Sequence, residues 1–232
     1  MSLFVIGDTH LSLSTDKPMD VFGGWDAHEQ RLETYWREVV RDTDTVVIPG
    51  DISWGMSLEE ARADFAFLDK LPGQKLLMKG NHDYWWCTRR KMDAFFTENG
   101  FSSLRIVHND AVAVEEKVAV CGTRGWFYDA EQDADRKVLN REVGRLRASV
   151  QAAVDTGLEP IAFLHYPPVW GEERCQVFLD VLKAYGVTRC YYGHVHGPGI
   201  RQAFNGEIDG VHLQLASADA LKFVPLHIPL SK

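Results

Sequence analysis

The strongest constraint on the fold is a series of six short, largely apolar runs bounded by Gly, Pro or Asp. They lie at residues 3–6, 45–48, 75–78, 117–121, 160–164 and 188–192. Nearly continuous apolar runs of this length are typical of strands that are buried on both faces of a sheet. The sequence therefore predicts a buried sheet core.

Helical patterns separate several of these runs. We expect helices at residues 27–42, 58–70, 88–98, 134–155 and 173–185. In the first of them Leu32 and Trp36 share a face, and Asp26 followed by Glu29 predicts a capping box at its start. Alternation of strands and helices predicts an α/β architecture with layered packing, in a single domain spanning residues 1–232.

Two stretches depart from that alternation. Residues 102–121 and 200–228 resemble consecutive short strands joined by tight turns, such as one at Asn205–Gly206. An Asn-Gly pair is a strong hairpin signal. We therefore expect antiparallel pairs to be mixed into the sheets.

Charge and composition exclude some classes of protein. A formal net charge of −8 argues against extended nucleic-acid binding, which requires a stripe of Lys and Arg. The opening MSLFVIGDTH has neither a basic segment nor a long apolar one, so we expect a cytoplasmic protein without a membrane anchor. No metal-binding spacing and no function is predicted for the cysteines, which are Cys87, Cys121, Cys175 and Cys190.

Polar residues, several of them next to a glycine, follow the apolar runs at the point where each run ends. They are Asp8 and His10 after the first run, Gly50 and Asp51 after the second, Gly80, Asn81, His82 and Asp83 after the third, His165 after the fifth, and Gly193, His194 and His196 after the sixth. Ligands of open α/β sheets bind outside the carboxyl ends of the strands. We therefore expect these side chains to gather at one edge.

Each signal has a plain structural alternative when it is taken alone. An Asp-x-His sequence after a strand often forms a turn, and His165 fits a buried, hydrogen-bonded histidine. His194 and His196 are more specific, since alternate residues of an extended segment share a face. No local structural reason accounts for all five strand ends together.

The ordered set D-x-H, GD, GNHD, H and GHxH, which spans residues 8–196, resembles the calcineurin-like metallophosphoesterase superfamily. The resemblance implies a sandwich of two mixed β-sheets flanked by helices, in an αββα arrangement, with a dinuclear metal centre at one edge. It also implies seven metal ligands: Asp8, His10 and His196 for one divalent ion, Asn81, His165 and His194 for the other, and Asp51 as a bridge. Carboxylate, amide and imidazole ligands without thiolates suit Mn, Fe or Zn.

The resemblance also implies roles beside the metals. A hydroxide bridging the two ions would attack the phosphorus. His82, which has no metal assigned, would contact the phosphate together with Asn81 and protonate the leaving group, with Asp83 as an orienting group. Arg124 could reach the phosphate, although an Arg in a Gly-rich loop is more often a surface residue.

Aromatic residues cluster next to these motifs. Trp54 follows Asp51, and Tyr84, Trp85 and Trp86 follow Asp83. They could pack the core beneath the site, or wall a pocket that binds a flat or apolar leaving group. We name Trp54 as a candidate substrate contact.

The resemblance does not extend to the protein Ser/Thr phosphatases. Those enzymes continue the second motif as GDxxDRG and write the third as GNHE, whereas here the second reads Gly50-Asp51-Ile52-Ser53-Trp54-Gly55-Met56. We predict a phosphohydrolase acting on a small phosphomonoester or phosphodiester, such as a nucleotide. Two alternatives are a protein-binding scaffold, which loses catalytic positions that this chain keeps, and a nuclease, which needs a basic groove.

Overall fold

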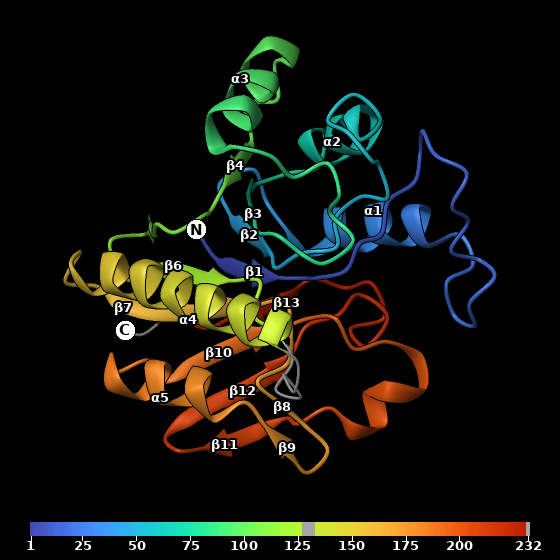
Figure 1. Ribbon diagram of the computed structural model, residues 1–232. Helices are drawn as coiled ribbons and strands as arrows, with labels where there is room; N and C mark the ends of the chain where they lie inside the picture. Colours follow the sequence, from blue (N-terminus) through green and yellow to red (C-terminus); the bar gives the residue numbers. More distant parts are fainter. Residues whose placement is uncertain (127–132, 231–232) are drawn as a thin grey trace.

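Two sheets packed face to face form the centre of the protein, seen in a computed structural model that describes residues 1–126 and 133–230 (Figure 1). The first sheet contains β1 (Leu3–Val5), β2 (Thr45–Ile48), β3 (Gln74–Leu77), β4 (Leu104–Ile106) and β13 (Leu226–Ile228). Its strand order is β13-β1-β2-β3-β4. Strands β1 to β4 are parallel, and β13 pairs antiparallel with β1.

The second sheet has parallel central strands and antiparallel edges. It contains β5 (Val112–Val114), β6 (Val118–Thr123), β7 (Glu159–Leu164), β10 (Arg189–Tyr192), β11 (Gly206–Ile208) and β12 (Val211–Leu215). Its order is β11-β12-β10-β7-β6-β5, with β11 and β5 antiparallel to their neighbours. Because the central strands are parallel, the loops that follow them leave each sheet at one edge.

Helices cover the outer faces of the two sheets (Figure 1). Those on the first sheet are α1 (His28–Val39), α2 (Arg62–Asp69) and α3 (Arg89–Asn99), and those on the second are α4 (Asp133–Val154) and α5 (Gln176–Ala184). A 3₁₀ helix, η1 (Gly197–Gln202), and a small hairpin of β8 (Val169–Trp170) and β9 (Glu173–Arg174) complete the elements.

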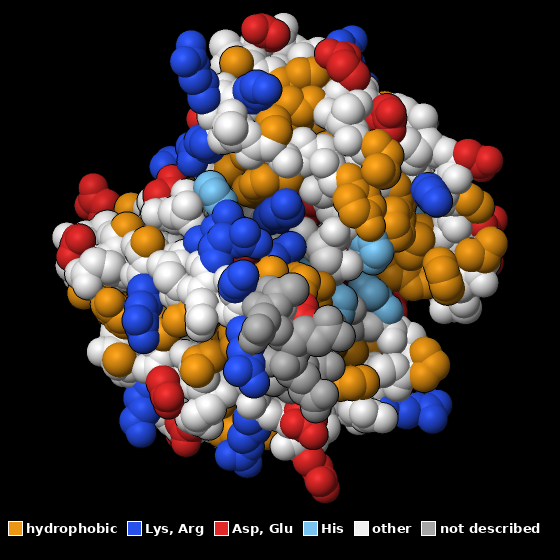
Figure 2. Space-filling model, viewed as in Figure 1, with side chains coloured by type: hydrophobic (Ala, Val, Ile, Leu, Met, Phe, Trp, Pro, Cys, Tyr) orange, Lys and Arg blue, Asp and Glu red, His pale blue; other side chains and the backbone are white. Residues whose placement is uncertain are grey.

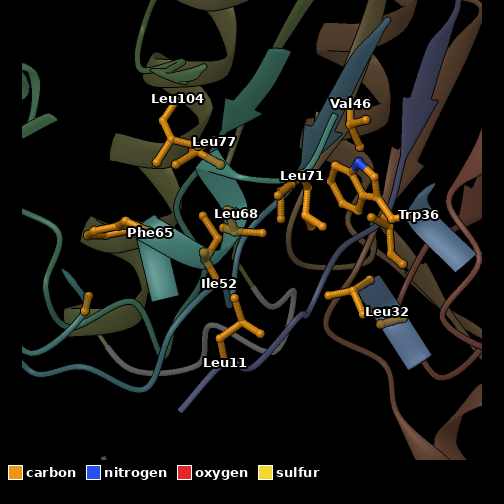
Figure 3. Packing of buried hydrophobic residues seen from close by; sticks show 14 of the residues in the cluster. Leu11, Leu32, Trp36, Val46, Ile52, Phe65, Leu68, Leu71, Leu77 and Leu104 are labelled. Carbon is orange, nitrogen blue, oxygen red and sulfur yellow. The ribbon is translucent and has the colours of Figure 1, made fainter. Parts of the chain in front are cut away.

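Three hydrophobic clusters hold these layers together. One joins the first sheet to its helices, and Figure 3 shows in that cluster Trp36 of α1 beside the strand residue Val46, with Phe65 and Leu68 of α2 farther along it. A second joins the other sheet to α4 and α5, and a third lies between the sheets. Burial on both faces explains the continuous apolar strands. The predicted αββα sandwich is therefore confirmed.

Several local predictions were wrong. The capping box does not form: α1 begins after Ala27, which has a left-handed φ of 48°, and no side chain caps the helix. The predicted turn at Asn205–Gly206 lies instead at Asp209–Gly210, where both residues have positive φ, as a two-residue I′ hairpin requires. Asn205 accepts a hydrogen bond from the Leu215 N–H across that hairpin.

Other element boundaries moved by a few residues. The helix predicted over 58–70 begins at Arg62, and the one over 173–185 begins at Gln176 because Glu173–Arg174 pairs as β9. Within 102–121, β4 joins the first sheet and β5 the second, so only β5 and β6 form an antiparallel pair. That all of residues 1–232 form a single domain stays a prediction.

Two further observations concern the described residues as a whole. None of their helices combines the length and apolar character needed to cross a bilayer. The four cysteines are free thiols, three of them buried, and lie apart from the side chains discussed below.

Candidate metal centre

The candidate site lies at the seam where the strand ends of the two sheets meet. The N–H of Gly7, two residues after β1, donates to the carbonyl of Ala216, the residue that follows β12, over 2.7 Å. This contact joins the first sheet to the second next to Asp8. Residues that follow strands in either sheet are thereby brought to one place.

The backbone at this seam is held in an uncommon conformation. Asp8, His10, Asp51 and His194 all have positive φ, between 43° and 71°. A non-glycine residue in the left-handed region costs on the order of 1–3 kcal/mol and persists where the surroundings enforce it. Four of the seven predicted ligands share this feature, which is typical of functional sites.

Two glycines are required by the close approach of the motif loops. A Cβ on Gly80 would collide with the Asp51 carboxylate, and one on Gly193 with the Asp8 carboxylate. The glycines of the GNHD and GHxH motifs therefore allow two loops to press against the acidic ligands.

The first ligand group consists of Asp8, His10 and His196. The Nε2 atoms of His10 and His196 are 3.3 Å apart, and Nε2 of His196 is 3.4 Å from Oδ1 of Asp8. Asp8 comes from the first sheet and His196 from the second. We call these three residues the outer group, because the His196 side chain is 28% exposed.

The second ligand group consists of Asp51, His165 and His194, joined by Asn81. Oδ1 of Asn81 is 2.6 Å from Nε2 of His165 and 3.0 Å from Nδ1 of His194. The His165 side chain is fully buried. We call these four residues the inner group.

One carboxylate oxygen connects the groups. Oδ2 of Asp51 is 3.8 Å from Nε2 of His10 in the outer group and 3.5 Å from Nε2 of His165 in the inner group. The other oxygen of Asp51 accepts the His82 N–H at 2.8 Å. Asp51 is thus positioned between the two groups, as a bridging ligand would be.

Burial sets the protonation of most of these histidines. It lowers the pKa of His10 to about 3 and that of His194 to about 4, and it lowers the pKa of His165 well below its usual range. These rings are neutral at pH 7 and keep a lone pair for a metal.

Asp51 and His196, in contrast, have raised pKa values. Burial, followed by the nearby carboxylates of Asp83 and Asp8, raises the pKa of Asp51 well above its usual range. For His196 burial lowers the pKa, but the carboxylates of Asp8 and Asp219 outweigh it and raise the value to about 10. A bound cation would stabilise the ionised form of these neighbouring carboxylates.

The donor atoms fit two divalent ions. Two atoms that each lie about 2.1 Å from one ion are roughly 3–3.5 Å apart. Several separations between candidate ligand atoms fall in this range, including 3.3 Å between the Nε2 atoms of His10 and His196 and 3.2 Å between Nδ1 of His194 and Nε2 of His165, whereas Oδ1 of Asn81 lies closer to Nε2 of His165, at 2.6 Å. The donor set is oxygen and imidazole, without thiolate.

His82 lies beside these groups and belongs to neither. Its ring centroid is 5.9 Å from that of His10 and 4.5 Å from that of Trp54. Its Nδ1 is buried and has no hydrogen-bond partner among the described residues. The ring is therefore next to the ligands without being held by a neighbouring carboxylate.

Asp83 does not orient His82, contrary to the prediction. Its carboxylate accepts the backbone N–H groups of Asp51, Ile52, Ser53 and Gly80 and the indole N–H of Trp85. Burial raises its pKa to about 6, while these donors lower it. Asp83 ties the GD loop to the GNHD loop, and so positions Asp51.

Sequence reasoning missed Asp219. Its Oδ1 is 3.0 Å from Nδ1 of His196, and its Oδ2 accepts the Gly197 N–H at 2.9 Å. A carboxylate on the far nitrogen of a metal-binding histidine fixes the ring and its tautomer. Asp219 follows β12, so the rule that polar residues after strands meet at one edge could have found it.

Arg124 reaches the site only through its backbone. Its carbonyl accepts the N–H groups of His165 and Tyr166, at 3.1 and 2.8 Å. Its guanidinium lies 3.5 Å from the buried Glu142 and 4.7 Å from the ring of Trp126. The side chain therefore sits in a separate pocket beside the inner group.

The aromatic residues next to the motifs divide into two kinds. Trp54 is half-buried and stacks on His10 at 5.1 Å. Trp85 is only 2% exposed and packs edge-on against Phe65 in the core. Trp54 therefore adjoins the ligands, whereas the suggested wall role for Trp85 was wrong.

The family profile described as calcineurin-like phosphoesterase matches residues 1–198. The chain belongs to the calcineurin-like phosphoesterase family. Membership makes it a phosphoesterase, a hydrolase that depends on divalent metal ions, and the two groups of candidate ligands agree with this. No curated protein sequence matches the chain.

Solved structures share the fold of this calcineurin-like phosphoesterase at low identity. Phosphopantetheinyl hydrolase (PptH) from Mycobacterium tuberculosis has a TM-score of 0.57 at 13% identity, covering 98% of this chain and 95% of that one. A protein of unknown function from Aquifex aeolicus, AQ665, has a TM-score of 0.50 at 16% identity, covering 97% and 95%. TT1561 of Thermus thermophilus has 0.51 at 12%, covering 84% and 81%.

Proposed function

We propose that this chain is a dinuclear phosphohydrolase for small phosphoesters, with one divalent ion in the outer group and one in the inner group. The observation that carries the proposal is the position of Asp51, whose Oδ2 lies within 3.8 Å of His10 and 3.5 Å of His165. Mn, Fe or Zn suits the oxygen and imidazole ligands.

When bound, the ions would polarise the phosphoryl oxygens and lower the pKa of a water shared between them. Asn81 of the inner group and His82, whose ring lies beside the outer group, would contact the phosphate. Asp83 and Asp219 act at one remove, because they hold Asp51 and His196 in place. Together these residues would fix the phosphorus in line with its attacking and leaving oxygens.

His82 would donate a proton to the leaving oxygen. Burial lowers the pKa of its ring in the free protein, but a phosphate dianion beside it favours the charged imidazolium. The ring lines the pocket described next, from which a substrate would reach it.

A pocket next to His82 supports a flat or apolar leaving group. Its volume is about 490 Å³. Trp54, Met56 and Tyr84 line it beside His82, and the rest of its lining is polar or charged: Ser14, Thr15, Asp16, Lys17 and Glu60. Met56 and Tyr84 are more than half exposed, so the pocket opens to solvent along apolar side chains. Aromatic surfaces of this kind favour an aryl ester or a nucleotide over inorganic polyphosphate.

The experiment is elemental analysis of the purified protein after Mn reconstitution, followed by assays on chromogenic monoesters and diesters and on nucleotides. We expect about two ions per chain and activity that chelators abolish. A content near zero, with activity unchanged in excess EDTA, would overturn the dinuclear proposal. The same assays decide between monoester and diester substrates.

The apolar pocket has its own test. Trp54→Ala should lower kcat/KM on a nucleotide about 3- to 10-fold more than on glycerophosphate, because only the nucleotide offers a ring to stack on. Trp85→Ala is the control, since this core residue should affect both substrates equally through folding. Equal losses for Trp54→Ala on both esters would remove Trp54 from the substrate contacts.

The alternative function, a protein-binding scaffold, is tested by the same assays. A scaffold would bind metals but hydrolyse none of the esters. We also propose the cytoplasm as the location, which the free thiols of the four cysteines support.

A further inference from the structure

A second pocket, of opposite character, lies beside the inner group. Its charged lining residues are Lys79 after β3, Arg124 after β6, and Glu142 and Arg145 on α4. We call it the cationic pocket. It shares no lining residue with the apolar pocket next to His82.

Positive charge exceeds negative charge in this lining. Arg124 and Arg145 share one oxygen of Glu142, at 3.5 and 2.6 Å, and the other oxygen accepts the Thr123 hydroxyl at 2.7 Å. One buried carboxylate thus serves two guanidinium groups. Lys79 has no ion pair among the described residues, although the chain as a whole carries a net charge of −8.

Donor capacity is left over as well. Nε of Arg124 is buried and has no hydrogen-bond partner among the described residues. Arg145 uses one guanidinium nitrogen on Glu142, and its side chain is 31% exposed. The buried Nε of Arg124 adds positive charge but cannot reach an anion at the surface, whereas the partly exposed guanidinium of Arg145 has donors to spare for one.

The cationic pocket is tied to the inner group by the chain itself. Lys79 directly precedes Gly80 and the ligand Asn81, and the Arg124 carbonyl accepts the N–H of the ligand His165. Figure 2 shows Lys and Arg side chains gathered at the centre of one face, with histidine side chains on either side. An anion bound there would be a near neighbour of the phosphate at the metals.

We propose that the cationic pocket binds a second anionic group, a phosphate or carboxylate, carried by the same substrate molecule. This inference rests on the proposed phosphohydrolase function. The cavity itself is narrow, at about 10 Å³, so the anion would sit at its mouth, against the exposed sides of the three cations. The substrate is therefore a phosphoester with an additional negative group.

The experiment compares adenosine 3′,5′-bisphosphate with adenosine 5′-monophosphate on the metal-reconstituted protein. Both share the base and the 5′-phosphate, and the rate compared is cleavage of the 5′-phosphoester, which gives adenosine 3′-phosphate from the first and adenosine from the second. The ratio of the two kcat/KM values then reports the effect of the second phosphate. We expect the parent to prefer the bisphosphate about tenfold or more, the usual worth of a charged hydrogen bond. The preference should shrink with added salt, since the pocket is partly exposed.

Lys79→Met and Arg145→Ala should each remove most of this preference. Lys79→Met leaves the Glu142 ion pairs intact, so it remains informative if Arg145→Ala folds poorly. Arg147→Ala is the matched control, because Arg147 is an exposed residue of the same helix outside the pocket. It removes one positive charge and should keep the ratio of the parent.

Each outcome bears on a different claim. A parent that hydrolyses both nucleotides without preference, or variants that keep the preference, would overturn the cationic pocket as a substrate site. A shift of the ratio by Arg147→Ala as large as that by Lys79→Met would also overturn it, since general charge would then explain the effect. If the parent hydrolysed no ester at all, the result would instead contradict the proposed phosphohydrolase function.

Discussion

The outer and inner groups hold similar side chains by different means. In the outer group His196 is part-exposed, and Asp219 fixes its ring by a hydrogen bond of 3.0 Å. In the inner group His165 is fully buried, its Nε2 is 2.6 Å from Oδ1 of Asn81, and its Nδ1, 3.6 Å from the Asp8 carboxylate, has no hydrogen-bond partner among the described residues. The two groups therefore differ in what holds a candidate ligand, a carboxylate at His196 and burial beside an amide at His165, and we expect them to differ in their sensitivity to mutation.

Substitution of Asp51 should disturb metal binding in both groups, and we expect it to have the largest effect on activity. Asp51→Asn keeps the size of the side chain but removes the charge between the groups. We expect the content to fall well below two ions per chain and kcat to fall by about 10³-fold or more, since metal ions stabilise the transition state by several kcal/mol. Elemental analysis and steady-state kinetics measure this. Retention of two ions with near-normal activity would show that Asp51 does not bridge.

His82 and His194 separate catalysis from metal binding. His82→Ala should lower kcat by roughly 10²- to 10⁴-fold with metal content near that of the parent, because His82 lies outside both groups. His194→Ala should lose metal as well as activity. The loss for His82→Ala should be smaller on p-nitrophenyl esters, whose leaving group needs less protonation. An emptied site in His82→Ala would reassign this residue as a ligand.

Substitution of Asp219 should affect metal binding in the outer group alone, because Asp219 contacts His196. Asp219→Asn should weaken binding of one of the two ions by about 10- to 100-fold, as is usual for the partner of a metal-binding histidine. Metal titration by calorimetry should resolve one weakened and one normal site. Asp209→Asn is the matched control, in the exposed β11–β12 turn. Equal weakening of both sites would contradict the distinction between the groups.

Substitution of Asp64 should have the smallest effect on activity, because it should change the free energy of unfolding rather than metal binding. Its carboxylate accepts the Leu13 N–H at 2.8 Å and the Ser53 hydroxyl, so it joins the loops after β1 and β2. Burial raises its pKa to about 6, above the ordinary 3.8, so the folded state favours the protonated form. That stabilisation is complete below pH 4 and is lost as the pH rises through 6.

Asp64→Asn cannot ionise and should therefore gain stability relative to the parent between pH 4 and pH 7. The gain should not exceed about 3 kcal/mol, the equivalent of a shift of some two pKa units. Urea unfolding of both proteins in EDTA, at several pH values, measures the difference. A constant difference across that range would show that Asp64 titrates normally.

The strands and most of the site could be predicted from sequence because both depend on local patterns. Apolar runs buried on two faces stand out, and the ligands follow them directly. Asp219 was missed because its role depends on a contact with His196, 23 residues away. The predictions of a capping box and of a turn at Asn205–Gly206 were wrong because contacts with distant residues set the backbone conformation there. The hydrogen bond from the Leu215 N–H to Asn205 is one such contact.

The long separation between Asp8 and His194, 186 residues, has a consequence for protein synthesis. On a growing chain Asp8, His10, Asp51 and Asn81 emerge first, and this half-built centre offers mainly oxygen atoms. Such a set prefers Mg or Mn to Zn. The three remaining histidines, which bring most of the nitrogen atoms, appear only when the second sheet is translated. We therefore expect the proposed centre to favour nitrogen-seeking ions only after the ribosome has passed residue 196.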